Sequence, residues 1–207
     1  MKHTPICDKI ILEQWLKSGV MDNYEYSRTE KGTPQGGIIS PVLCNVALNG
    51  IEGIVMKRFP LKKGISPGVH LIRYADDMVV TGKNPEILAE IKSAMQEYLK
   101  ERGLEFNDKK TKIVHIKEGF DFLGFNISRK KWDPQLNKET EQETVLIIKP
   151  SEKGISKLKD KIAQTIAKDS PLERIISDLN PILRGWGEHK RISYHSQETF
   201  ISIDHYI

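Results

Sequence analysis

Several features that would place the protein in other classes are missing from its sequence. Its two cysteines, Cys7 and Cys44, form neither a metal-binding spacing nor a disulfide framework, which favours a reducing compartment. No apolar run approaches the roughly 18 residues that a membrane span needs, and the N-terminus has no apolar signal-peptide region. We therefore expect a cytoplasmic protein of bacterial type that does not associate with membranes, and an organellar origin stays open.

Acidic residues are also missing from one long stretch. Between Gly53 and Ala75 the chain has five lysines or arginines and no aspartate or glutamate. The net charge of the whole chain is only +4, which is a weak indication of a polyanionic partner. A basic stretch directly before an acidic pair suits a site that handles phosphates and metal ions. Solvated loop lysines are the simpler alternative.

What is present is enough to form a core. The chain has 207 residues, of which 38% are hydrophobic, and this fits one domain with a smaller appendage. Helical spacing of apolar residues predicts helices over 10–19, 41–55 and 85–99. Gly50 and Gly53 weaken the second helix or let another group approach its backbone. The third is the clearest, because Asn84 followed by proline is a typical helix start.

Strand patterns lie between and after these helices. They predict a hairpin from 69–74 and 78–82, further strands at 111–116 and 120–127, and a last strand at 144–150. A strand, a helix and another strand on one antiparallel sheet make an α+β domain.

The C-terminal part has a different pattern. A polar stretch over 128–143 precedes it. Apolar residues within 155–166 and 172–179 then repeat at helical spacing and predict two amphipathic helices. We expect a small helical module from about residue 151.

Asp76 and Asp77 stand at the turn of the predicted hairpin, in the stretch RYADDMVV. A surface turn is the simplest explanation, since aspartate is a common turn residue. However, a tight hairpin would fix both carboxylates at one edge of a sheet, and Mg²⁺ usually takes one or two carboxylates together with substrate phosphates. Two such ions about 3.5–4 Å apart can align the attacking and leaving oxygens of nucleotidyl transfer. The pair is therefore a candidate site for Mg²⁺, with Mn²⁺ as an alternative.

Five blocks along the chain resemble the reverse transcriptases of group II introns. The blocks, in order, are KGTPQGGIISPVLCN (31–45), YADD (74–77), LKERGLEFNDKKTKIV (99–114), FDFLGF (120–125) and LNPILRGWGEH (179–189). The last resembles the thumb, or maturase domain X, of that family. The resemblance implies RNA-directed DNA synthesis by two-metal nucleotidyl transfer, with RNA (intron RNA or a template–primer duplex) and dNTP as partners.

The same resemblance implies an α+β fold in which a partial right-hand polymerase palm is followed by a small α-helical thumb. Its boundaries would be a partial palm over 1–127, a connector with the last strand over 128–150, and the thumb or domain X over 151–207.

The resemblance also implies roles in catalysis. Asp76 would be the main metal ligand and Asp77 an auxiliary one, while Lys110 would reach the pyrophosphate leaving group. The residues expected next to the nucleotide or template are Gln35, Gly36, Gly37 and Tyr74. The glycines of TPQGG would let the backbone approach a nucleotide, with a helix-entry loop as the alternative.

Further residues are expected at the primer and the RNA. The resemblance places Gly124 near the primer end, and Arg184, Lys190 and Arg191 could meet phosphates of a duplex. We interpret Trp186 as a core residue rather than a stacking platform.

The sequence departs from the family pattern in its first part. The polymerase site needs a third carboxylate before TPQGG, but Asp8 precedes a helix and Asp22 is expected in a turn. The fingers are not recognisable either. We therefore expect no polymerisation by the chain alone, with the site restored by a separate polypeptide that holds the fingers and first palm segment. Self-association through a cut edge of the palm sheet is also expected. The alternatives are an RNA-binding maturase-like module that assists splicing, and a folded non-functional remnant of a mobile element.

Overall fold

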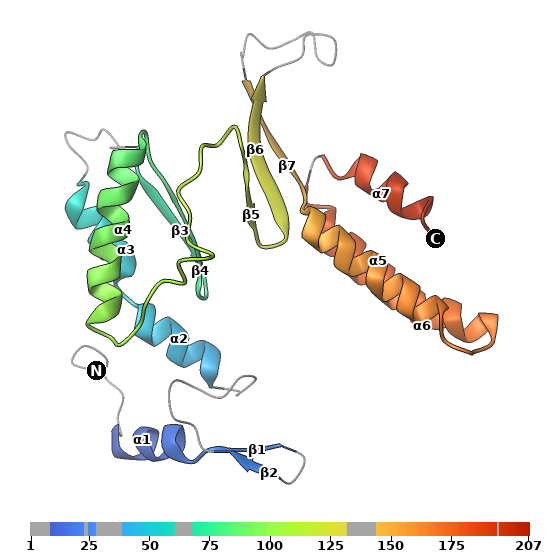
Figure 1. Ribbon diagram of the computed structural model, residues 1–207, viewed down its shortest axis with the longest axis horizontal. Helices are drawn as coiled ribbons and strands as arrows, with labels where there is room; N and C mark the ends of the chain where they lie inside the picture. The colour runs from blue at the N-terminus through green and yellow to red at the C-terminus, as the bar shows by residue number, and fades with distance from the viewer. Residues whose placement is uncertain (1–8, 23–24, 28–38, 61–67, 132–143, 194) are drawn as a thin grey trace. The chain divides into compact units, whose positions relative to one another are not determined.

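A computed structural model describes residues 9–22, 25–27, 39–60, 68–131, 144–193 and 195–207. The protein combines α-helices with short antiparallel sheets, so the predicted α+β class is confirmed (Figure 1). The chain divides into two compact units, Met1–Ile113 and Val114–Ile207. No helix of the described part is long and apolar enough to cross a membrane.

The first unit begins with a helix and a small hairpin. Helix α1 (Lys9–Lys17) is followed by β1 (Val20–Asp22), which pairs antiparallel with β2 (Glu25–Ser27). The helix was predicted. The expectation that Asp22 lies in a turn is wrong, because Asp22 is the last residue of β1. At Gly19 the backbone adopts a φ of 79°, and a Cβ there would lie 2.6 Å from the carbonyl oxygen of Ser27. This glycine therefore allows the reversal between α1 and β1.

The predicted helix over 41–55 is two helices in the structure. Helix α2 (Ser40–Leu48) ends before Gly50, and α3 (Ile51–Arg58) begins after it. Gly50 has a φ of 97°, which ends the first helix and changes the chain direction. Both suggestions made for this glycine are confirmed, because the hydroxyl of Tyr98 also approaches here and donates a hydrogen bond to the carbonyl of Asn49.

The predicted helix α4 (Pro85–Lys100) is confirmed together with its cap, since the Oδ1 atom of Asn84 accepts a hydrogen bond from the Ile87 amide at 3.4 Å. Its buried face completes the core of the unit. The core residues from α2, α3, the start of the next hairpin and α4 are Leu48, Ile51, Val55, Val69, Ile91, Met95 and Leu99.

The hairpin of β3 (His70–Tyr74) and β4 (Asp77–Thr81) packs one face against this core. The strands pair antiparallel with Tyr74 opposite Asp77, so Ala75 and Asp76 form a two-residue turn. The prediction of this hairpin is confirmed. Within the described residues, no third strand joins it.

The second unit contains a three-stranded sheet, in the order β5 (Phe120–Phe122), β6 (Phe125–Lys131) and β7 (Thr144–Pro150). The last strand was predicted. The expectation of one sheet is wrong, because β3–β4 and β5–β7 are separate sheets in different units. The segment 120–127 is a hairpin, because Leu123 and Gly124 both have positive φ, of 50° and 79°, as a two-residue type I′ turn requires.

Two more expectations about strands are corrected here. Residues 111–116 do not form a strand. One turn precedes the segment at 108–110 and another begins at its last residue, Ile116. The carbonyl of Ile116 accepts a hydrogen bond from the Arg129 amide of β6 at 2.9 Å. The strand expected to end at residue 127 continues to Lys131, so the first residues of the polar stretch belong to β6.

Three helices complete the second unit: α5 (Glu152–Ile166), α6 (Leu172–Lys190) and α7 (Gln197–Asp204). The first two confirm the predicted amphipathic pair, and α7 was not predicted. Their core residues are Leu158, Ile162, Leu179 and Ile203. Trp186 packs against this core and meets the edge of Phe200 at a ring-centroid distance of 5.7 Å, which confirms its interpretation as a core residue.

We predict opposite effects for two neighbouring glycines. Gly50→Ala should lower the free energy of unfolding by about 1–2 kcal/mol, because alanine is strained at positive φ and its Cβ would lie 3.2 Å from the Tyr98 hydroxyl. Gly53→Ala, inside α3 with no atom within 4 Å of the added Cβ, should raise it by about 0.5–1 kcal/mol. Urea denaturation followed by circular dichroism measures both. Equal effects of the same sign would contradict the prediction.

Candidate active site

The aspartate pair lies at the tip of the β3–β4 hairpin. Asp76 is the second residue of the turn and Asp77 is the first residue of β4; both side chains are exposed. No ion pair within the described part of the chain engages either carboxylate. Two adjacent, accessible carboxylates are oxygen donors of the kind that Mg²⁺ takes. Asp76 and Asp77 thus fit the predicted metal site as a partial ligand set.

In the described part of the chain, no third ligand is found near this pair. No group of three or more histidine, cysteine, aspartate or glutamate residues that could hold a metal ion occurs among the described residues. Asp8 lies outside those residues. For Asp22 the structure gives the strand but not the side chain.

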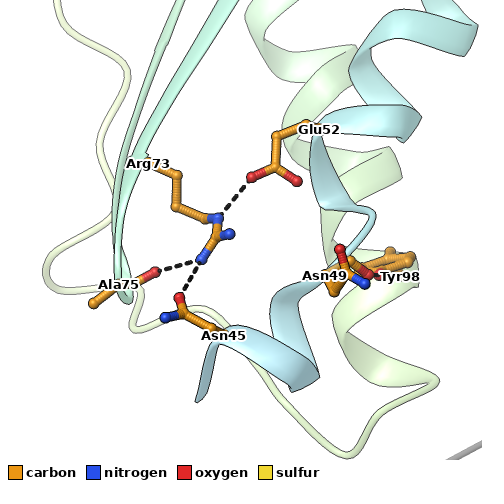
Figure 2. A network of polar contacts seen from close by, with 6 residues as sticks. All are labelled: Asn45, Asn49, Glu52, Arg73, Ala75 and Tyr98. Atoms are coloured by element: carbon orange, nitrogen blue, oxygen red, sulfur yellow. Dashed lines mark hydrogen bonds and ion pairs between the residues drawn. The ribbon is translucent and has the colours of Figure 1, made fainter. Parts of the chain in front are cut away.

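Arg73, directly before Tyr74, connects the hairpin to the two helices before it (Figure 2). Its Nε donates to Glu52 Oε1 at 2.7 Å, and its Nη1 donates to Asn45 Oδ1 at 2.9 Å and to the Ala75 carbonyl at 3.2 Å. Asn45 belongs to α2 and Glu52 to α3, so one guanidinium joins the turn to both helices. The sequence analysis did not identify this residue, although a charged residue between the apolar positions of a strand was an indication.

The ion pair between Arg73 and Glu52 affects the titration of the carboxyl. The hydrogen bond from Arg73 lowers the pKa of Glu52, against the raising effect of partial burial. A lowered folded pKa means that the pair stabilises the fold fully above the ordinary glutamate pKa of about 4.3. This stabilisation is lost as the pH falls through the folded pKa.

The other residues predicted near the nucleotide are less closely connected. Tyr74 is 65% exposed on β3. Lys110 is exposed in the turn that begins at Asn107, and no hydrogen bond or ion pair within the described residues joins it to the aspartates. Gln35, Gly36 and Gly37 lie outside the described residues.

In the second unit the structure gives Gly124 and Lys190 a shared role. The carbonyl oxygen of Gly124 accepts hydrogen bonds from Lys190 Nζ at 2.6 Å and from the Ser151 amide at 3.0 Å. Lys190 is only 4% exposed, and its Nζ lies 4.0 Å from the centre of the Phe125 ring. Burial lowers the pKa of the Lys190 ammonium.

This geometry bears on two expectations. A Cβ at Gly124 would lie 2.5 Å from Lys190 Nζ, so lysine occupies the space on that side of the glycine. Lys190 is enclosed and bonded to the protein, which does not suit a phosphate contact. We therefore leave Lys190 out of the nucleic-acid surface proposed below, while the place of Gly124 near the primer stays a prediction.

Exposed basic residues lie elsewhere on the helices of this unit. Arg184 is exposed on α6, and Arg191 is exposed and forms an ion pair with Glu188 at 3.0 Å. Lys153, Lys157 and Lys161 are exposed and recur every four residues of α5, so they share one face of that helix.

Comparison with known proteins decides the family. The family described as Reverse transcriptase (RNA-dependent DNA polymerase) matches residues 1–127, which is more than half of the chain. The chain belongs to the reverse transcriptase family. The group II intron maturase-specific domain matches residues 155–207, so the chain belongs to the group II intron branch of this family, as the sequence motifs indicated.

The chain is also similar to several curated proteins, two of which are named as intron proteins. Protein YkfC of Escherichia coli is 31% identical over 150 residues, which cover 58% of this chain and 39% of the relative. The putative COX1/OXI3 intron 2 protein of Saccharomyces cerevisiae is 25% identical, covering 59% of this chain and 20% of the relative. The group II intron-encoded protein LtrA of Lactococcus lactis is 24% identical, and the match covers 56% of this chain and 29% of the relative. The matched part of the chain thus spans well under half of these relatives.

We predict that Lys190 stabilises the second unit and that its neighbour does not. Lys190→Ala should lower the free energy of unfolding by about 1.5–3 kcal/mol, because it removes a buried charge-assisted hydrogen bond. Arg191→Ala should cost about 0.5 kcal/mol or less, because its ion pair is exposed. Urea denaturation of both variants measures the difference. An effect of Lys190→Ala as small as that of Arg191→Ala would show that the buried contact is not stabilising.

Proposed function

We propose that the chain provides the metal-binding hairpin and the RNA-binding thumb of a group II intron reverse transcriptase. The observation that supports this most directly is the YADD turn, with two accessible carboxylates on a hairpin that the core holds, in a chain of this family. Residues 1–127 would form the partial palm, 128–150 the connector with its last strand, and 151–207 the thumb or domain X.

In this proposal Asp76 is the main ligand for Mg²⁺ or Mn²⁺, and Asp77 is an auxiliary ligand. The metal ions would supply positive charge that aligns the attacking and leaving oxygens of nucleotidyl transfer. Lys110 would contact the leaving pyrophosphate, and Tyr74, with the TPQGG residues Gln35, Gly36 and Gly37, would contact the dNTP or template.

The proposal also includes a second polypeptide. Two carboxylates are an incomplete set for two metal ions, and β3–β4 has no neighbouring strand within the described residues. Ile72 and Tyr74, on the outward face of β3, are 55% and 65% exposed. Strand edges without partners pair readily with other strands. A segment that adds a strand with the third carboxylate would complete both the sheet and the site, and self-association through the same edge is the alternative.

A second candidate function is an RNA-binding maturase module without polymerase chemistry. The match of the maturase-specific domain to residues 155–207 supports it, as do Lys153, Lys157 and Lys161 on α5, because lysines on one face can contact successive phosphates. A remnant of a mobile element would have neither function.

Primer extension with Mg²⁺ on an RNA template tests the first function. The chain, mixed with a polypeptide that supplies the fingers and first palm segment of a group II intron reverse transcriptase, should extend the primer. Asp76→Asn should reduce extension to the level without protein, because it removes the main metal ligand. Asp121→Asn is the matched control: Asp121 is an exposed aspartate of the other hairpin, bonded to Asn126 at 2.9 Å.

Three outcomes of that assay are distinguishable. Extension that Asp76→Asn abolishes and Asp121→Asn preserves supports a polymerase. Extension that survives Asp76→Asn contradicts the assigned metal ligand. No extension in any mixture, with specific binding of intron RNA intact, favours the maturase module.

The RNA-binding surface has a separate prediction. Replacing Lys157 and Lys161 together by glutamine should weaken RNA binding and reduce the slope of log affinity against log salt by about 0.7–0.9 for each phosphate that the protein no longer neutralises. Lys17→Gln is the control, because Lys17 is exposed on α1 and already pairs with Glu13 at 2.6 Å. Fluorescence anisotropy with intron RNA and with unrelated RNA of equal length measures both. An unchanged slope in the double variant would remove α5 from the RNA surface.

A further inference from the structure

Arg73 holds a position that its sequence neighbourhood does not explain. Its side chain is only 18% exposed, on the face of β3 that is turned toward α2 and α3 (Figure 2). The residues on either side of it, Ile72 and Tyr74, are both largely exposed. A strand therefore turns its arginine inward and leaves the neighbouring apolar and aromatic side chains outside.

The guanidinium explains this arrangement. Arginine has five N–H donors in a rigid planar fork, so it can bond several fixed acceptors at once. Here the acceptors are one helix-borne carboxylate, one helix-borne amide oxygen and one backbone carbonyl, from Glu52, Asn45 and Ala75. A lysine ammonium, which is a compact point donor on a flexible chain, cannot reproduce this fork.

The third acceptor lies within the metal-binding turn. Ala75 has a φ of 55°, an unusual conformation for a residue with a side chain, which persists where the surrounding contacts impose it. The carbonyl of Ala75 and the amide of Asp76 belong to one planar peptide group. A bond that fixes this carbonyl therefore also fixes the orientation of the backbone that leads into Asp76.

The charge of Arg73 is also compensated where it would otherwise oppose a metal ion. A lone arginine beside a divalent cation site would repel the cation. The partner carboxylate of Glu52, at 2.7 Å, makes the pair neutral overall. The pair can thus hold the turn without a net positive charge next to the aspartates.

We propose that Arg73 is a positioning residue, which orients the Ala75–Asp76 peptide against α2 and α3 and so arranges the two aspartates for a divalent cation. Glu52 and Asn45 serve as its anchors on the helices. The proposal rests on the function proposed above, in which Asp76 and Asp77 bind the metal. It adds a group that contacts neither metal nor substrate.

Mn²⁺ titration of the whole chain, followed by the broadening of backbone amide signals in nuclear magnetic resonance, tests this directly. In the unchanged protein the signals of Asp76 and Asp77 should broaden first. Arg73→Lys keeps the charge but loses the fork, and it should weaken Mn²⁺ binding at these signals by about 10-fold or more, as is typical when the support of a metal ligand is removed. Glu52→Gln, which keeps an acceptor oxygen, and Asn45→Ala, which removes one hydrogen bond from an exposed position, should cause smaller losses.

The control makes the same arginine-to-lysine change in another ion pair, at Arg58 of α3, the helix that also carries Glu52. Arg58 at the end of α3 donates through Nε to Glu90 Oε1 of α4 at 2.5 Å, away from the turn. Arg58→Lys should leave the Mn²⁺ affinity within about 2-fold of the unchanged protein. Urea denaturation of every variant separates a loss of metal affinity from a loss of stability.

Each outcome decides a different point. If Asp76 and Asp77 of the unchanged protein do not respond to Mn²⁺, either alone or with the polypeptide that supplies the first palm segment, the proposed metal site is wrong and the role of Arg73 is wrong with it. If they respond equally in the unchanged protein, Arg73→Lys and Asn45→Ala, the metal site stands and Arg73 is only a structural residue. A selective loss in Arg73→Lys, with Arg58→Lys unaffected, supports the proposal. If Arg73→Lys does not fold, Asn45→Ala decides by the same comparison.

Discussion

The guanidinium of Arg73 is the constraint on which the geometry of the first unit depends. Apolar burial supplies the stability of this unit: Ile51 and Ile91, on α3 and α4, are 0% and 2% exposed. Burial is not directional, however, and it does not determine how a hairpin tip is oriented above the core. Hydrogen bonds are directional and can fix the orientation of the hairpin tip. Those of Arg73 reach two helices and one turn carbonyl, so this side chain links the turn to α2 and α3 in addition to the apolar contacts of the hairpin.

The parts of the fold that local patterns specify were predictable. Helix α4 has a capping asparagine, a proline in its first turn and buried residues four positions apart, all within one segment. The β3–β4 hairpin and the amphipathic α5 and α6 are similar cases. The strand expected at 111–116 had the right composition, but a strand also needs a partner, and pairing is a long-range property. For the same reason the separation of β3–β4 from β5–β7 could not be derived from the sequence.

The candidate site, too, was predictable from the sequence only in part. Two adjacent aspartates in a turn, within a recognisable motif of eight letters, predict a candidate metal-binding hairpin, and the structure has a hairpin at that place. The two helix-borne partners of Arg73, Glu52 and Asn45, are 21 and 28 positions away in the sequence, so no local pattern indicates them. For Lys190 the local pattern was misleading. A lysine in the last turn of a helix resembles a phosphate ligand, but tertiary packing encloses this one between α6 and the β5–β6 turn.

The carbonyl of Gly124 has a consequence for the order in which the second unit assembles. Its two donors come from the start of α5 and from the last residue of α6, and the bond to Lys190 spans 66 positions. The β5–β6 turn and the α5–α6 pair form through nearer contacts, which close smaller loops at lower entropic cost. The long-range bond can form only when both are in place. We therefore expect this bond to form after those nearer contacts and to link the β5–β6 turn with both helices once they are present.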